Sequence, residues 1–191
     1  MNDENNVNID IKQKGLENFI LLVLGMVDRP MSMLHLEKEV FLLWNFDKQI
    51  QPFLRFIKHF RGPFSKEIQE TIFDPVYLDE HWEYIPPKKT DNISGGCVVV
   101  TDIGNEEYAR LFSKMAEREE FVHLLAGIKM VRELYDKLTL KELLLLIYDT
   151  YPEFVQNSDI SEDINQQKPL LIKSLMRKGF LDEERYISLI N

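Results

Sequence analysis

The stretch FIKHFRGPFSKE, spanning Phe56–Glu67, lies between an amphipathic helical pattern and two β-prone runs. Gly62-Pro63 within it predicts a turn, because glycine permits backbone conformations closed to other residues and proline fixes φ and has no N–H. Ser65 is a suitable N-cap for a short helix over 66–72. The run before the turn, Phe53–Phe60, is interpreted as a short strand or extended segment.

Two helical patterns are expected before this stretch. Apolar residues between Leu16 and Val27 recur at helical spacing, and Pro30 cannot continue that helix. Ser32 is expected to cap the second helix. The polar, acidic residues 1–14 are expected to form a flexible tail. The apolar face of the second helix comprises Leu36, Val40, Leu43 and Trp44.

A β-hairpin is predicted after the stretch. Trp82–Ile85 and Cys97–Thr101 are β-prone, and the breaker-rich sequence at 86–96 forms the tip between them. Thr101 then caps a helix that ends near Met115. Helix, helix, turn, helix and hairpin is the element order of a winged-helix module, so we predict such a domain over 15–116, with the hairpin as its wing. Its expected core comprises Leu36, Val40, Leu43, Ile68, Ile72 and Val99.

Residues 117–191 are predicted to form a C-terminal helical extension packed on this domain, which makes the whole fold mainly α (α+β). Thr139 and Glu142 have the spacing of a capping box, and Gly179 is a helix stop. The helices of the extension are expected over Phe121–Leu138, Leu140–Tyr151, Ile164–Arg177 and Glu183–Ile190.

The first two helices of the extension are apolar around most of their circumference. A helix of this kind must be covered on several sides. Either the two helices pack on each other and on the winged-helix domain, or they form a surface for a homodimer or a partner protein. The candidate protein-interaction residues are Phe121, Leu125, Ile128, Leu144 and Ile147.

Four segments of the chain resemble motifs of the YwgA-like uncharacterised winged-helix proteins and, more distantly, of the Panacea antitoxin domain. They are LEKEVFLL (Leu36–Leu43), FRGPFSKEI (Phe60–Ile68), VVVTDIG (Val98–Gly104) and LTLKELLLLIYDTYPEF (Leu138–Phe154). The resemblance implies a place among antitoxins, phage-associated proteins and adaptor-like proteins, which share no catalytic machinery. It carries over no functional residue.

The charge distribution leaves two interpretations of the surface open. The chain has a net charge of −9, which counts against general nucleic-acid binding, yet the segment from Lys48 to Lys66 holds five basic residues and no acid. That patch is either a phosphate-facing surface or a solvated edge strand protected by its charges. In a DNA-binding protein the third helix would enter the major groove, where Glu67 and Glu70 are unfavourable. The candidate nucleic-acid-binding residues are Arg55, Lys58, Arg61, Lys66, Gln69, Thr71, Lys88 and Lys89.

No catalytic, cofactor-binding or metal-binding residue is predicted, and no small-molecule substrate is evident. The four histidines lie far apart in the sequence, and Cys97 is the single cysteine. The longest apolar run, Phe19–Val27, is too short to cross a bilayer. We therefore expect a cytoplasmic, non-enzymatic interaction protein that docks on a protein partner, with a DNA-binding regulator as the alternative.

Overall fold

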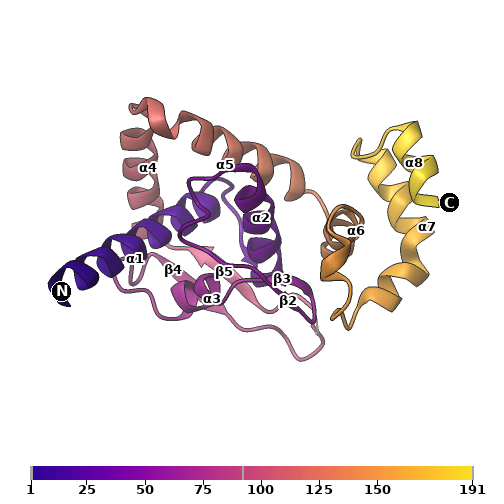
Figure 1. Ribbon diagram of the computed structural model, residues 1–191, viewed down its shortest axis with the longest axis horizontal. Helices are drawn as coiled ribbons and strands as arrows, with labels where there is room; N and C mark the ends of the chain where they lie inside the picture. The colour runs from indigo at the N-terminus through magenta and orange to yellow at the C-terminus, as the bar shows by residue number, and fades with distance from the viewer. Residues whose placement is uncertain (1, 92, 191) are drawn as a thin grey trace.

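Helices surround two small antiparallel sheets in the computed structural model, which describes residues 2–91 and 93–190, and side chains over 9–91 and 93–189 (Figure 1). The mainly α (α+β) class is confirmed. Up to the last strand the elements are α1 (Asn2–Gly25), β1 (Met31–Ser32), α2 (Met33–Phe46), β2 (Ile57–His59), β3 (Gly62–Phe64), α3 (Lys66–Phe73), β4 (Trp82–Ile85) and β5 (Cys97–Val100). The remainder are α4 (Asp102–Ala116), η1 (Glu119–Phe121), α5 (Val122–Tyr135), α6 (Leu140–Thr150), η2 (Pro152–Phe154), α7 (Ser161–Arg177) and α8 (Glu183–Ile190).

The first helix is longer than predicted. α1 begins at Asn2, so the expectation of a flexible tail over 1–14 is wrong for residues 2–14. No glycine or proline interrupts the chain before Gly15. The polar residues 2–14 therefore extend a helix whose C-terminal half is buried. Gln13 supports this extension by donating a hydrogen bond to Glu17 one turn later, at 2.8 Å.

A three-stranded antiparallel sheet contains the predicted hairpin. β4 pairs with β5, which confirms the hairpin, and β1 adds on the other side to give the order β1-β5-β4. Asn92, within the expected tip, lies outside the described residues. Successive side chains of a strand point to opposite faces. Val98 therefore faces the core at 1% exposure, whereas Val99 is half-buried, and its predicted place in the core is wrong.

A second hairpin replaces the predicted strand over Phe53–Phe60. β2 covers only Ile57–His59 and pairs with β3, with Phe60 and Arg61 as the turn. The predicted turn at Gly62-Pro63 is thus two residues too late, because both residues lie in β3. Proline is tolerated there because both strands of a two-stranded sheet are edge strands. Gly62 has φ +82°, and a Cβ on it would lie 3.1 Å from the Leu144 side chain.

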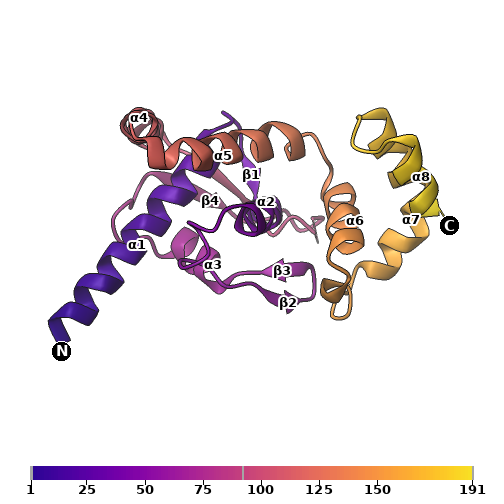
Figure 2. The same cartoon turned by 45° about the horizontal axis from the view of Figure 1, so that its top comes forward.

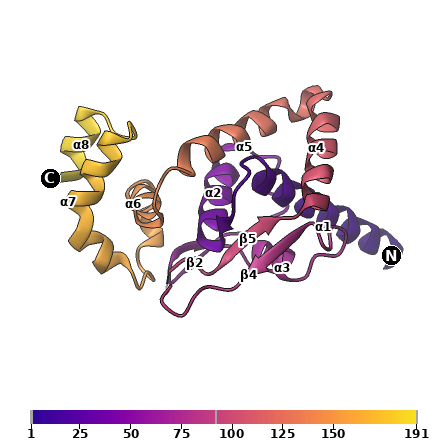
Figure 3. The same ribbon diagram turned by 180° about the vertical axis from the view of Figure 1, so that it is seen from behind.

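Helix α2 lies between two apolar cores. Its residues Leu36, Val40 and Leu43 pack with α1, α3, the three-stranded sheet and α5, as predicted together with Ile68 and Ile72. On the other side, Leu34, Phe41 and Leu42 belong to a core shared with α6, η2, α7 and α8, in which α6 packs on α2 and α7 packs on α6. Figures 1 and 3 show α6, α7 and α8 grouped at the end of the molecule away from the N-terminus of α1. Figure 2 shows α5 running between α4 and α6.

Helix caps follow the sequence in three of four predicted cases. The Thr139 hydroxyl and the Glu142 carboxylate form the predicted capping box, and the Ser32 and Thr101 hydroxyls accept backbone N–H groups at the starts of α2 and α4. Ser65 precedes α3, but its hydroxyl donates to Glu67 instead of accepting a backbone N–H. Among the described residues, no helix combines the length and hydrophobicity needed to cross a membrane.

Candidate functional site

Most of the predicted nucleic-acid-binding residues are exposed, but they come from separate elements. Lys66 pairs with Glu70 at 2.5 Å across one turn of α3, so an acidic group lies directly beside its charge. Lys58 in β2 donates to Gln156 at 3.0 Å. The other exposed members of the set are Arg55 before β2, Gln69 on α3, and Lys88 and Lys89 between β4 and β5.

Two members of that set are instead buried or half-buried and make contacts within the protein. Thr71 is wrong as an outward residue, because helical spacing places it with Ile68 and Ile72 on the inner face of α3, where it is 1% exposed. Arg61 is half-buried and donates to the Ile93 carbonyl at 3.0 Å. Its Nε lies 4.0 Å from Asp159 Oδ1, so Arg61 connects the β2–β3 turn to two distant loops.

The predicted protein-interaction surface is wrong for four of its five residues. Leu125 and Ile128 belong to the first core, and Leu144 and Ile147 belong to the second, all at 6% exposure or less. α5 and α6 each pack on α2, one in each core, and not mainly on each other, so the structural interpretation of their apolar circumference holds only for their packing on the preceding part of the chain. Phe121 alone is half-buried. The exposed apolar side chains of α5 are Val122, Met130 and Leu134.

A cleft of about 350 Å³ opens between the β2–β3 hairpin, α3 and the three-stranded sheet. We call it the hairpin groove. Its principal lining residues are Glu37, His59, Phe60, Arg61, Gln69, Phe73 and Tyr84.

Aromatic rings line the hairpin groove from both sides. Phe73 from α3 packs edge-on against Tyr84 from β4, with ring centroids 4.6 Å apart. On the hairpin, His59 stacks on Phe64 at 4.7 Å. Phe60 and Phe73 nevertheless remain 61% and 50% exposed. Exposed aromatic side chains around a concavity are typical of protein-binding surfaces.

A buried ion pair lies at the floor of the hairpin groove. Lys38, 1% exposed, donates to Glu37 Oε2 and to the Pro63 carbonyl, each at 2.9 Å. Burial lowers the pKa of Lys38 and raises the pKa of Glu37, and the opposite charge of each partner counteracts its shift. The segments LEKEVFLL and FRGPFSKEI, far apart in the sequence, meet at this contact. Lys38 therefore fixes the hairpin over α2 and holds a carboxylate in the groove.

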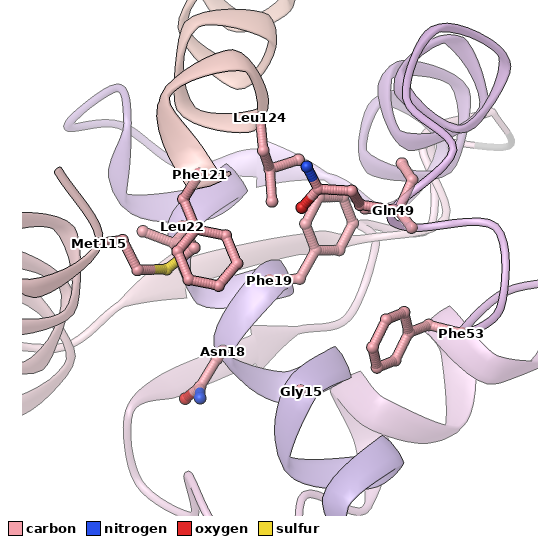
Figure 4. Close-up of a pocket in the computed structure, with 10 residues that line it drawn as sticks. Gly15, Asn18, Phe19, Leu22, Gln49, Phe53, Met115, Phe121 and Leu124 are labelled. Carbon is pink, nitrogen blue, oxygen red and sulfur yellow. The ribbon is translucent and has the colours of Figure 1, made fainter. Parts of the chain in front are cut away.

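A second concavity, of about 220 Å³, lies where α1, the loop after α2, and the junction of α4 with α5 meet (Figure 4). We call it the aromatic pocket. Phe19, Phe53 and Phe121 come to it from three different segments. Phe121 is the member of the predicted interaction set that lines this pocket. Sequence reasoning missed both concavities, because each is assembled from residues with no local pattern in common.

The described residues offer few groups suited to metal binding or nucleophilic catalysis. No group of three histidine, cysteine, aspartate or glutamate side chains there could hold a metal ion. The His35 ring is held by the Ser32 hydroxyl at 2.8 Å and the Leu138 carbonyl at 3.0 Å. Cys97 is half-buried in β5.

Neither protein-family models, curated proteins nor solved structures give a match to this chain. The resemblance to YwgA-like proteins and to the Panacea domain therefore stays a prediction. The case for function rests on the two concavities and on the charges around them.

Proposed function

We propose that this chain is a non-enzymatic winged-helix interaction protein that docks on a protein partner through the hairpin groove. The helix order α1, α2, α3 followed by β4 and β5, with β1 completing the sheet in the order β1-β5-β4, supports the winged-helix assignment. The β2–β3 hairpin is then an insertion between the second and third helices. This insertion supplies one wall of the groove.

The observation that carries the proposal is the pair of exposed rings, Phe60 and Phe73, at one concavity. Large aromatic side chains that fill pockets provide much of the binding free energy of protein interfaces. Both side chains are large and apolar, yet at least half of each stays exposed. A partner segment that packs an apolar side chain between them would remove this surface from water.

The charges favour a basic partner segment. Within the groove Lys38 lies beside Glu37 and Arg61 lies near Asp159, so the preference comes from the charge of the chain as a whole. The whole chain carries −9. Complementary charges speed the encounter of two proteins and disfavour wrong partners. The resemblance suggests the setting, an antitoxin-like, phage-related or defence-related complex.

Site-directed photo-crosslinking in the producing cell tests the docking site. A benzophenone amino acid would replace Phe60 or Phe73, and Leu170 on α7, which is 71% exposed, provides the matched control. We expect the same discrete adduct from both groove positions and none from position 170. An adduct of twice the mass of the chain would identify a second copy as the partner. Equal labelling at all three positions would contradict the proposal.

Affinity for the purified partner provides the quantitative test. Phe60→Ser and Phe73→Ser should each weaken binding by about 1–2 kcal/mol, the usual cost of truncating a partly buried interface aromatic. Leu170→Ser should leave the affinity unchanged. Because both rings are largely exposed, the melting temperature should change little. Unchanged affinity in both groove variants would refute docking at this groove.

DNA binding is the second candidate function, and the exposed Lys88 and Lys89 on the β4–β5 loop favour it. In a winged-helix protein this loop is the wing tip and lies near the DNA backbone. The Lys66–Glu70 pair and the buried Thr71 weaken the contribution of α3. Fluorescence anisotropy with duplex DNA at about 50 mM salt distinguishes the functions, since phosphate contacts make affinity fall steeply with salt. Binding lost in the Lys88→Glu/Lys89→Glu variant would support DNA recognition.

A further inference from the structure

The aromatic pocket is separate from the hairpin groove, and the two share no lining residue. Its walls come from α1, from the loop after α2 and from the turn between α4 and α5. Figure 4 shows the rings of Phe19, Phe53 and Phe121 disposed around the same space. Because these segments are far apart in the chain, the pocket depends on the tertiary fold.

The lining of the aromatic pocket contains no charged side chain. Phe19, Leu22 and Leu124 form its buried side, and Phe53 and Phe121 are half-buried at its edge. A charged ligand would lose its hydration here without gaining a counter-charge among the lining residues. An uncharged apolar ligand would lose only unfavourable contact with water.

Two amide side chains provide the polar component of the lining. The Gln49 amide nitrogen donates to the Glu120 carbonyl at 2.9 Å, which fixes the side chain and leaves its carbonyl oxygen as an acceptor. Asn18 on α1 is the other amide. A small number of placed polar groups within an apolar lining is the usual composition of a small-molecule site. The acceptor at Gln49 suits a ligand with one N–H or O–H donor.

The size of the aromatic pocket limits the ligand. A dry apolar cavity of about 150 Å³ is sufficient to bind benzene. The present pocket, at about 220 Å³, has room for a somewhat larger planar compound. Its three rings can contact such a compound by stacked or edge-on packing.

We propose that the aromatic pocket binds a neutral compound of one or two fused aromatic rings that carries a single hydrogen-bond donor. This site does not depend on the proposed docking at the hairpin groove. Ligand binding would connect α1 to the α4–α5 junction, because the pocket walls belong to both.

Indole is a suitable probe, and indole-5-carboxylate is its anionic counterpart. Isothermal titration of the full chain should give one site for indole with a dissociation constant on the order of 0.1 mM, which corresponds to an ordinary affinity per ligand atom. The carboxylate should bind at least about tenfold more weakly, because its charge is not compensated in the pocket. A raised melting temperature with indole should accompany binding.

Two pocket variants and one control complete the test. Phe121→Ala removes a half-buried wall and should weaken indole binding about tenfold, and Leu124→Phe should fill the space and abolish it. Leu134→Ala, on the exposed side of α5, should bind as the unmodified chain does. If Leu124→Phe fails to fold, Phe121→Ala still decides the result.

The proposal is overturned by any of three results with the folded chain. They are no saturable binding up to about 2 mM indole, equal affinity for the carboxylate, and unchanged affinity in Phe121→Ala.

Discussion

Replacing Arg132 by methionine should destabilise the protein in a way that depends on pH. Arg132 on α5 and Glu39 on α2 are both 0% exposed, and Arg132 Nη1 donates to Glu39 Oε2 at 2.7 Å. In the described part of the chain, Glu39 Oε1 and Arg132 Nε have no hydrogen-bond partner. Burial raises the pKa of Glu39 to about 7 even though Arg132 opposes the shift. The contacts between Arg132 and Glu39 therefore offset only part of the desolvation cost of the two buried charges.

The size of the effect follows from these contacts. Removing one member of a buried ion pair costs about 3–5 kcal/mol, and we expect about 3 kcal/mol at about pH 8, because Glu39 can take up a proton instead of remaining a lone buried charge. Without Arg132 the pKa of Glu39 rises above 7. At about pH 8, one unit above the pKa of about 7, ionisation of Glu39 stabilises the unmodified native chain by about 1.4 kcal/mol relative to its protonated form, and the variant loses this contribution.

The sign follows from proton binding. The raised pKa means that native Glu39 holds a proton that the unfolded chain has released, so its contribution to stability falls as pH rises from 4.5 to about 7 and then levels off. In Arg132→Met the fall continues above pH 7. The variant should thus be closer to the unmodified chain at about pH 5.5 than at about pH 8. Relief of the Arg132 repulsion on His35 acts in the same direction.

Urea denaturation at the two pH values measures the effect, with two further variants as references. Glu39→Leu/Arg132→Met should recover most of the lost stability, since a buried ion pair can be replaced by apolar residues at little cost. Lys129→Met removes an exposed α5 partner of Glu133 and should change stability by less than about 0.5 kcal/mol. A destabilisation by Arg132→Met that is equal at both pH values, or a double variant as unstable as the single one, would refute this reasoning.

Three further predictions concern single positions. Gly62→Val should cost about 1–3 kcal/mol, measured by chemical denaturation, because φ is +82° and the added Cβ would lie 3.1 Å from Leu144; an unchanged melting temperature would count against it. Thr139→Ala should lower the unfolding free energy by about 1 kcal/mol through loss of the capping box, whereas an effect near zero would show that the cap adds nothing. Burial lowers the pKa of His35 below 6.5, so its contribution to stability is lost as pH falls through 6.5, and His35→Gln should flatten that acid-side loss in unfolding titrations; an unaltered slope would contradict this origin.

Local signals predicted the helices and the long hairpin well. These signals act over a few residues, and the structure has helices and strands where they predict them. Examples are the capping box of Thr139 and Glu142, the helix stop at Gly179, and the β-prone runs. The 57–64 hairpin was misjudged because Gly62-Pro63 resembles a turn by itself. Its actual conformation depends on Lys38, which lies 25 positions earlier and bonds the Pro63 carbonyl.

Contacts between distant segments, which also form the two concavities, were harder to foresee for the same physical reason. Glu17 is an example: its carboxylate is fully buried and accepts the backbone N–H groups of Val76, Tyr77 and Leu78 at 2.7–2.9 Å. In the sequence it is one more acid near the start of a helix. Likewise, the apolar circumference of α5 and α6 is compatible both with burial inside the protein and with docking on a partner. Burial of both helices required a second apolar face on α2.

The position of α2 between two cores has a consequence for synthesis of the chain. Phe41 lies against Phe154, with ring centroids 5.0 Å apart, yet Phe154 is made long after Phe41. At about 5–20 residues per second, roughly 110 residues separate their emergence by about 5–20 s. During that time the nascent chain can complete the first core while the far side of α2, with Leu34, Phe41 and Leu42, is still open to water and to other chains. The last helices thus bury this face only late in synthesis. A ribosome that stalls before residue 154 leaves a product whose exposed apolar side chains can aggregate.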